Sequence, residues 1–297
     1  MRVLTEASGS MISAYLIKSI QEAGQIAVAS DVDLDCYAKQ IANEFIQMPP
    51  NKDPELWGKI KDLLKKNKID IVIPSLDETL YGWALNAETF NQAGVSIILS
   101  EKETIRIFQD KWLTYIFFRD NEIPCPNTSL DQEFELIKPR NGRGSQGIFK
   151  TKSKTNMDGN ISQHFVEGTE YTIDVFCDKY SNPVYIVPRK RKHIKDGKST
   201  AGIVVKHENI ESWVKQICSA IKFKGPINIQ CIEEEDGEIK FIEINPRIAG
   251  GMALGFAATE NWISLIISHF INGDEISPQQ VKYGLKMKRY YSEAFFY

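Results

Sequence analysis

Short apolar, β-branched runs alternate with amphipathic segments through the first hundred residues. In the amphipathic segments apolar residues recur at spacings of three and four, which predicts helices. Asp53 and Pro54 suit a helix N-cap and first helical position, and Gly94 is typical of a helix end. The expected strands are residues 2–4, 25–29, 69–73 and 95–99, and the expected helices are 11–23, 53–67 and 79–93. This βαβ order predicts a parallel sheet with helices on both faces.

The pattern becomes richer in strands after residue 100. Two helices are expected first, at residues 101–108 and 110–121, and Pro124 and Pro126 follow them. Asp236-Gly237 joins the last two expected strands and is a dipeptide that favours positive φ in a hairpin turn. The expected strands are 134–138, 147–150, 161–166, 171–177, 184–187, 227–233 and 238–243, and the helices are 210–220 and 262–272. We therefore expect a second unit of the α+β type.

Composition and charge narrow the function classes. The 297-residue chain has a net charge of −3, whereas a nucleic-acid-binding protein would show a basic excess. No window approaches the roughly 18 apolar residues of a membrane span, and no basic head precedes an apolar stretch at the N-terminus. The five cysteines and four histidines do not have the spacings of a zinc site or a disulfide framework. We expect a cytoplasmic protein that binds neither nucleic acid nor membranes.

The segment KPRNGRGSQG, residues 138–147, follows a strand that is expected to end at Lys138. Its three glycines let backbone N–H groups approach an anion closely, and its basic residues neutralise charge. The loop lies between two strands and no GK[ST] opens a helix, so it is not a Walker A loop. Glycine-rich hairpin loops are also common without a ligand. A flap over phosphates and a plain hairpin loop both remain open.

In the segment FIEINPR, residues 241–247, polar and apolar residues alternate with a period of two. The alternation places Glu243, Asn245 and Arg247 on one face of a strand. Carboxylate and amide oxygens are ligands that suit Mg²⁺, and Gln230 on the partner strand can add another. A solvated strand face is the alternative. Against it, the apolar neighbours predict burial, and a buried carboxylate needs a partner.

Residues 163–174, QHFVEGTEYTID, are expected to form a strand, a turn at Gly168 and a second strand. Such a crossing between two lobes offers backbone N–H and C=O groups to an adenine edge and a carboxylate to ribose hydroxyls. By itself, this segment is better explained as an exposed hairpin.

Together, the three segments resemble the ATP-grasp superfamily, and within it the branch related to the carbamoyl phosphate synthetase large subunit. Asp110-Lys111, KPRNGRGSQG, EGTEYTIDV, GPINIQ and FIEINPR occur in the family's order, and Pro74-Ser75-Leu76-Asp77-Glu78 resembles part of the family's N-terminal domain. The resemblance implies an α/β + α+β fold. A Rossmann-like pre-ATP-grasp domain is expected at residues 1–100, followed by a two-lobed ATP-grasp unit with lobes at 101–162 and 163–297.

The resemblance also implies residue roles. Lys111 and Lys138 would hold phosphates, and Arg247 would face the γ-phosphate or the acyl phosphate, so Lys138 and Arg247 are the catalytic candidates. Gly142, Gly144, Ser145 and Gly147 would shape the phosphate flap. Gln163 and the backbone of His164 and Phe165 would meet adenine, and Glu170 the ribose, although the family usually carries glutamate where Gln163 stands. Gln230, Glu243 and Asn245 would hold one or two Mg²⁺ ions, with Mn²⁺ as a substitute.

The implied activity is an ATP- and Mg²⁺-dependent ligase that activates a carboxylate as an acyl phosphate and joins it to an amine. Carbamoyl phosphate synthesis from bicarbonate and ammonia is one alternative, and a non-catalytic ATP-binding protein is another. The expected partners are a small-molecule carboxylate and a small-molecule amine. Homodimers are common among the proteins that the chain resembles.

Three more residues are candidates for substrate contact. Asp77 and Glu78 follow the carboxyl end of an expected strand, where α/β sheets bind ligands. They are expected either to contact the amine or to cap a helix. Arg191 belongs to the basic stretch 189–193, which continues with Lys195 and Lys198. This stretch is either a solvated charged turn or a grip for an anionic substrate.

Overall fold

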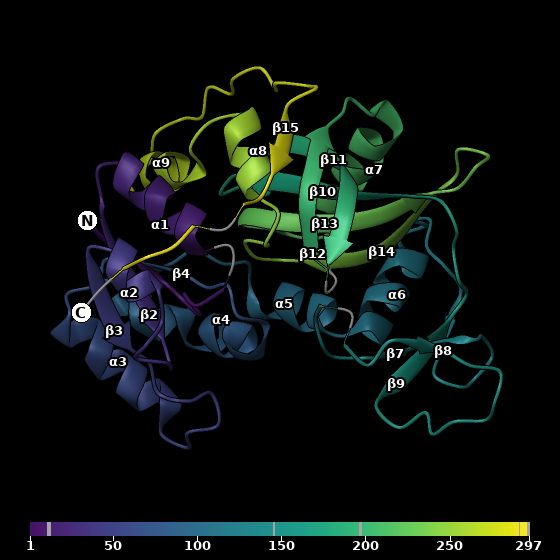
Figure 1. Cartoon of the computed structure of the whole chain (residues 1–297), viewed down its shortest axis with the longest axis horizontal. Coiled ribbons are helices and arrows are strands. Elements are labelled where there is room, and N and C mark those ends of the chain that lie inside the picture. The colour runs from purple at the N-terminus through teal and green to yellow at the C-terminus, as the bar shows by residue number, and fades with distance from the viewer. Residues whose placement is uncertain (11–12, 145, 196–197, 291, 296–297) are drawn as a thin grey trace.

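The computed structural model of the protein contains three β-sheets, each formed by one stretch of the chain (Figure 1). It describes residues 1–10, 13–144, 146–195, 198–290 and 292–295. Within these ranges, no helix has the length and apolar character that a membrane crossing needs.

The first sheet has five parallel strands in the order β3-β2-β1-β4-β5, as the βαβ pattern predicts. Its strands are β1 (Arg2–Thr5), β2 (Ile26–Asp31), β3 (Glu44–Gln47), β4 (Ile71–Ile73) and β5 (Ser96–Ile97), and its helices are α1 (Ser13–Glu22), α2 (Ala38–Ile41), α3 (Leu56–Lys66) and α4 (Asp77–Gln92). The short elements α2 and β3 were not expected. The prediction that Asp53 is the N-cap is wrong: Asp53 accepts a hydrogen bond from the N–H of Glu55 in a turn that precedes α3.

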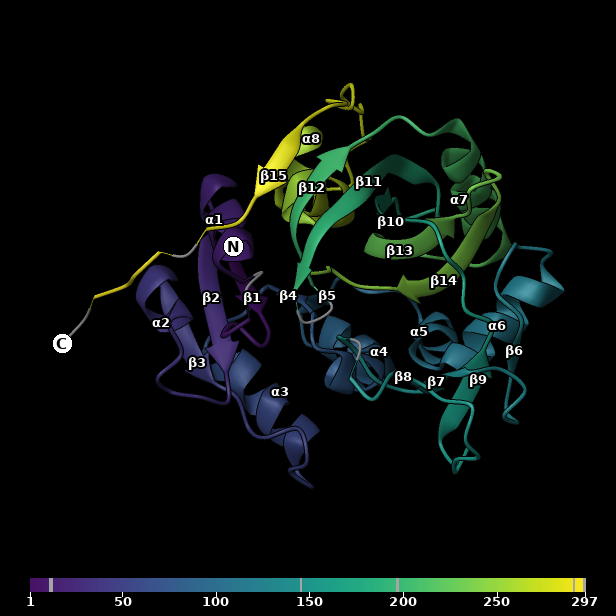
Figure 2. The same cartoon turned by 45° about the vertical axis from the view of Figure 1, so that its right-hand side comes forward.

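A helix pair leads from this unit to the second sheet. The helices are α5 (Lys102–Gln109) and α6 (Lys111–Asp120), close to their expected positions. The second sheet is antiparallel with the order β6-β9-β7-β8, and its strands are β6 (Thr128–Ser129), β7 (Leu136–Pro139), β8 (Phe149–Lys150) and β9 (Asn160–Gln163). Figure 2 shows α5 and α6 between the N-terminal unit and this sheet, next to β14.

The third sheet is antiparallel with the order β14-β13-β10-β11-β12-β15. Its strands are β10 (Thr169–Cys177), β11 (Pro183–Lys195), β12 (Lys198–Val204), β13 (Gly225–Glu233), β14 (Ile239–Asn245) and β15 (Lys286–Lys288). The accompanying helices are α7 (Glu208–Ala220), α8 (Ala253–Ala258), α9 (Trp262–Leu265) and the π-helix η1 (Ile266–Ile271). The single α-helix expected over residues 262–272 is therefore divided into α9 and η1.

The two faces of the third sheet differ in polarity. Alternation along β10 buries Tyr171, Ile173 and Val175 in a core cluster with apolar residues of α7. The opposite face presents polar side chains in two rows across β10, β13 and β14. One row is Thr172, Gln230 and Glu243, and the next is Asp174, Asn228 and Asn245. The period-two pattern thus directs the polar side chains of three strands to one face.

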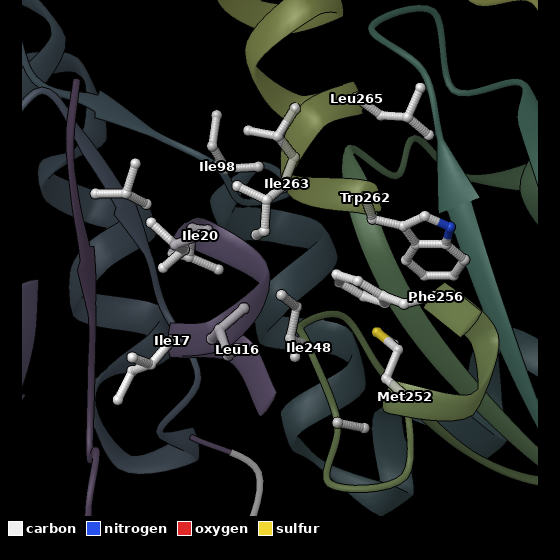
Figure 3. Close-up of a cluster of buried hydrophobic side chains, with 14 of the residues drawn as sticks. Leu16, Ile17, Ile20, Ile98, Ile248, Met252, Phe256, Trp262, Ile263 and Leu265 are labelled. Atoms are coloured by element: carbon white, nitrogen blue, oxygen red, sulfur yellow. The ribbon is translucent and has the colours of Figure 1, made fainter. Parts of the chain in front are cut away.

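The N-terminal unit packs on this third sheet through a shared hydrophobic cluster. Figure 3 shows that α1 brings Leu16, Ile17 and Ile20 into one cluster with Ile248 and Ile263 from the C-terminal half, and that Phe256 and Trp262 lie farther from α1. Asn261 adds a polar contact, because its side-chain amide donates to the backbone oxygen of Ser19 at 2.7 Å. This packing brings the end of the parallel sheet close to the end of β14.

Candidate functional site

A cavity of about 210 Å³ lies where four elements meet. The first turn of α4, the junction of α5 and α6, the loop after β7 and the end of β14 each contribute to its wall. Its polar lining is Asp77, Glu78, Gln109, Lys111, Thr114, Asn141, Arg143, Glu243 and Asn245, and Phe108, Gly142, Ile242 and Pro246 complete it. Residues predicted from separate sequence motifs therefore share one space.

The glycine-rich loop, residues 140–148, closes one side of the cavity. Gly142, Gly144 and Gly147 all have positive φ, and a Cβ on Gly147 would lie 2.8 Å from Cγ of Pro139. The ammonium group of Lys111 donates to the backbone oxygen of Gly142 at 3.0 Å. The structure thus joins Lys111 to the loop. Ser145, which was also predicted to shape the loop, lies outside the described residues.

The start of α6 is fixed beside this loop. Asp110 is the N-cap of α6, and its carboxylate accepts from the N–H of Trp112 at 2.8 Å. The same carboxylate pairs with the guanidinium of Arg140. Asp110 therefore holds the first residue of the loop against the helix that carries Lys111.

Lys138 and Gln163 contact each other on adjacent strands of the second sheet. The Lys138 ammonium group donates to Oε1 of Gln163 at 2.6 Å, and Nε2 of Gln163 donates to Oγ1 of Thr128 at 2.9 Å. Burial lowers the pKa of Lys138 to about 8, an effect that the charge of Lys111 reinforces and that Glu243 and Glu170 oppose. The oxygen and the nitrogen of the Gln163 amide thus both have hydrogen-bond partners within the protein.

The crossing between the second and third sheets follows Gln163, as the sequence predicts. The backbone N–H of His164 donates to the oxygen of Asn127 at 2.9 Å, so this donor is used within the protein. Phe165 is 42% exposed, and the ammonium group of Lys150 lies 3.0 Å from its ring centroid.

Gln230 and Glu243 are direct neighbours across the β13–β14 ladder. In the described part of the chain, neither side chain has a hydrogen-bond or ion-pair partner, although both are half-buried. Asn245 is two residues along the same face, and its Oδ1 accepts from Arg247 at 3.0 Å. The described residues contain no cluster of three or more His, Cys, Asp and Glu side chains. Amide oxygens would have to complete any cation site here.

Arg247 does not lie on the strand face, because β14 ends at Asn245. The prediction of a three-residue strand face is wrong at this residue. Its guanidinium instead donates from Nε to Oδ1 of Asp77 at 2.7 Å and from Nη2 to Oδ2 at 2.6 Å. Burial alone would lower the pKa of Arg247, but the carboxylates of Asp77, Glu243 and Glu78 outweigh it and raise this pKa. Arg247 therefore stays charged.

Asp77 and Glu78 do not cap α4. The N-cap position is Leu76 and receives no side-chain hydrogen bond, so the capping alternative is wrong. Asp77 binds Arg247, and Glu78 pairs with Arg143 of the glycine-rich loop at 3.0 Å. These two acidic residues link the N-terminal unit to both the loop and the end of β14.

Two family models match the chain. One, described as an ATP-grasp in the biosynthetic pathway with the Ter operon, matches residues 157–292, and one for a PylC-like N-terminal domain matches residues 7–98. Over residues 157–292 the chain is therefore similar to ATP-grasp proteins. It is similar to a tyramine–L-glutamate ligase of Methanocaldococcus jannaschii, with 25% identity over 205 residues, covering 66% of this chain and 62% of that protein.

A carbamoyl phosphate synthase large chain of Methanothermobacter thermautotrophicus is 25% identical over 266 residues, which cover 75% of this chain and 25% of that protein. This similarity confirms the branch of the superfamily. The chain thus spans less than two thirds of the length of these two relatives. Its fold resembles the biotin carboxylase domain of the Hydrogenobacter thermophilus 2-oxoglutarate carboxylase, with a TM-score of 0.73 and 17% identity over 96% of this chain and 73% of that one.

Two arginines of the basic stretch form ion pairs within the protein. Arg191 pairs with Glu170, so the residues predicted for the anionic substrate and the ribose bind each other. Arg189 is buried and pairs with Asp174, contrary to both expected roles of the stretch. The side chains of His193, Lys195 and Lys198 lie outside the described part of the structure.

The pair of Asp174 and Arg189 is a supporting feature that the motifs did not indicate. Asn228 donates to Oδ1 of Asp174 at 2.8 Å, in the row that also contains Asn245. A Cβ on Gly255 would lie 2.7 Å from Oδ2 of Asp174, so glycine is needed for this close approach. The sequence does contain one indication of this pair. Asp174 lies among Tyr171, Ile173 and Val175 in a strand that is expected to be buried, and a buried carboxylate needs a partner.

Proposed function

We propose that the chain is an ATP- and Mg²⁺-dependent ligase that activates a carboxylate as an acyl phosphate and joins it to an amine. The supporting observation is the shared cavity. Lys111 and the glycine-rich loop line it together with Glu243 and Asn245. Phosphoryl transfer depends mainly on alignment and charge neutralisation, for which this combination of groups is suited.

The half-buried oxygens of Gln230 and Glu243 fit a divalent cation, because they face the same side of the ladder and have no partner in the described chain. Asn245 adds a third oxygen. These are hard ligands of the kind that Mg²⁺ prefers, and Mn²⁺ accepts the same set. One or two bound ions would neutralise phosphate charge and keep the terminal phosphate in line.

Lys111, which lines the cavity, and Lys138, which precedes the glycine-rich loop, supply positive charge. We assign them to the phosphates, with Gly142, Gly144, Ser145 and Gly147 in the closing loop. The backbone after Gln163 would meet the adenine edge, and Glu170 the ribose. Arg247 would stabilise negative charge on the acyl group during attack by the amine. Closure of the loop would keep water from the acyl phosphate.

Asp77 and Glu78 place negative charge on the wall of the cavity, which suits an amine that arrives as an ammonium ion. The ligase activity of the Methanocaldococcus relative, which joins tyramine to L-glutamate by its name, agrees with this class of reaction. A homodimer is the assembly that we propose, since the structural neighbour is described as a domain dimer.

The test is a screen for ADP release in which small carboxylates are crossed with small amines, with Mg²⁺ and ATP in every well. The proposal expects ADP only where a carboxylate and an amine are both present. Release with bicarbonate and ammonia alone would replace it by carbamoyl phosphate synthesis. ATP binding without ADP release across the whole screen would indicate a non-catalytic ATP-binding protein.

A further inference from the structure

The wall of the cavity contains an ion pair whose two members are not equally accessible. Asp77 lines the cavity, whereas Arg247 does not. The guanidinium lies behind the carboxylate and binds it at 2.7 and 2.6 Å. A ligand in the cavity therefore meets Asp77 first and can contact Arg247 only where Asp77 moves away.

Asp77 occupies the edge of Arg247 that best fits a carboxylate. Nε and Nη2 form this edge, and two parallel hydrogen bonds from it give bidentate recognition. Two of the three other N–H groups are used elsewhere, since Nη1 donates to the oxygen of Ile248 at 3.2 Å and Nη2 also donates to Asn245. A substrate carboxylate would compete with Asp77 for the same two donors.

Displacement of Asp77 by a simple carboxylate would leave a charge without a partner. The side chain of Asp77 is only 23% exposed, and Glu78 and Glu243 are on the same cavity wall. Glu78 is already paired with Arg143, and the ammonium group of Lys111 is bound to the loop. An unpaired, largely buried carboxylate beside two others is unfavourable. A ligand that also carries an ammonium group removes this penalty.

Given the ligase function proposed above, we propose that Asp77 is a specificity-determining residue that selects a zwitterionic carboxylate, of the α-amino acid class, by exchange of ion pairs. The substrate carboxylate takes the place of Asp77 on Arg247, and the substrate ammonium group pairs with the released Asp77. One ion pair is replaced by two, and no charge is left unpaired. A carboxylic acid without an amino group can take the place of Asp77 on Arg247, but it leaves Asp77 without a partner.

The test is a thermal-shift titration of the whole chain with MgADP present, using matched pairs that differ by one ammonium group. The probes are L-alanine and propionate, L-glutamate and glutarate, and L-phenylalanine and 3-phenylpropionate. In at least one pair the amino acid is expected to bind about tenfold more tightly or better than its partner. Asp77→Asn should abolish this preference, since a neutral amide does not need the ammonium group.

Asp120→Asn is the matched control, because Asp120 pairs with Arg119 on the exposed surface of α6. It should keep the preference. If Asp77→Asn does not fold, Asp77→Glu keeps the charge and should retain the preference with weaker binding. Equal binding of both members of every pair by the wild-type chain, no binding of any probe, or an unchanged preference in Asp77→Asn would each overturn the proposal.

This readout does not require turnover, so it separates the two proposals. An amino-acid preference without ADP release in the screen would refute the ligase function and leave the ion-pair exchange standing. ADP release supported equally well by simple carboxylic acids would leave the ligase function standing and refute the role of Asp77.

Discussion

The ammonium group of Lys138 lies in an unusual environment. It has an amide as its hydrogen-bond partner, and burial lowers its pKa to about 8. The proton is therefore lost at a pH where other lysines remain charged. Because phosphate oxygens favour the charged form, a bound nucleotide should shift the equilibrium back towards the ammonium ion.

Nucleotide affinity should consequently depend on pH around this value. We expect the affinity for MgADP to be constant well below pH 8 and to fall as the pH rises through 8, because the free protein then loses the charge on Lys138. Isothermal titration calorimetry from pH 6.5 to 9.5 measures this. Lys138→Arg should remove the dependence, since arginine stays charged. A wild-type affinity that is flat across pH 8 would exclude Lys138 from phosphate binding.

At the scale of single elements, the described part of the glycine-rich loop is held by contacts at its start and in its middle. Arg140 pairs with Asp110, Lys111 donates to Gly142, and Arg143 forms an ion pair with Glu78 near the surface. The conformation of the loop depends on glycines with positive φ. Only at Gly147 does a neighbouring side chain also restrict the space, because Pro139 lies close.

This difference gives a matched pair of substitutions. Gly147→Ala and Gly144→Ala both place a Cβ at positive φ, but only the Gly147 variant brings it within 2.8 Å of Pro139. We expect Gly147→Ala to weaken ATP binding by about tenfold and Gly144→Ala by clearly less, since strained backbone costs about 1–3 kcal/mol. Titration calorimetry with MgATP compares them. Equal losses in the two variants would show that contact with Pro139 is irrelevant.

The elements themselves were predictable where the hydrophobic pattern was long and regular. The βαβ order, α4 to α6 and the β13–β14 hairpin were expected with small shifts at their ends. The elements α2 and β3 were not, because Ala38–Ile41 and Glu44–Gln47 are too short to establish a period. The clustering of Lys111, Gly142, Glu243 and Asn245 was implied by the family resemblance, and the structure places them around one cavity.

The roles of the arginines could not be predicted, since they depend on contacts between residues far apart in sequence. Arg247 and Asp77 are separated by 170 positions, and no local pattern connects them. The same holds for Arg143 with Glu78. Sequence alternation indicates which face a side chain occupies, but only the packing of the units determines its partner.

At the scale of the whole molecule, the site depends on how the N-terminal unit is docked. Asp77 and Glu78 belong to that unit, whereas Arg247 and Glu243 belong to the third sheet. The hydrophobic cluster in Figure 3 holds the two units together, with Ile20 fully buried in it. Stability and site geometry are therefore coupled through this contact.

Ile20→Ala should destabilise the protein by about 2–5 kcal/mol, because it leaves a cavity in this cluster. Ile26→Ala is the matched control, since Ile26 is 39% exposed and surface changes usually stay within about 0.5 kcal/mol. Urea unfolding followed by circular dichroism measures both. A loss for Ile20→Ala no larger than that for Ile26→Ala would contradict the proposed contribution of this cluster.

The claim on which the functional account depends is that Glu243 holds a divalent cation which positions the nucleotide. The decisive measurement is Mg²⁺-dependent ADP release by wild type, Glu243→Ala and Glu235→Ala under the best conditions of the substrate screen. Glu235 lies exposed in the same hairpin, so its variant controls for general effects. The account predicts no ADP release from Glu243→Ala, an unchanged melting temperature, and normal release from Glu235→Ala. Wild-type turnover by a folded Glu243→Ala variant would contradict it.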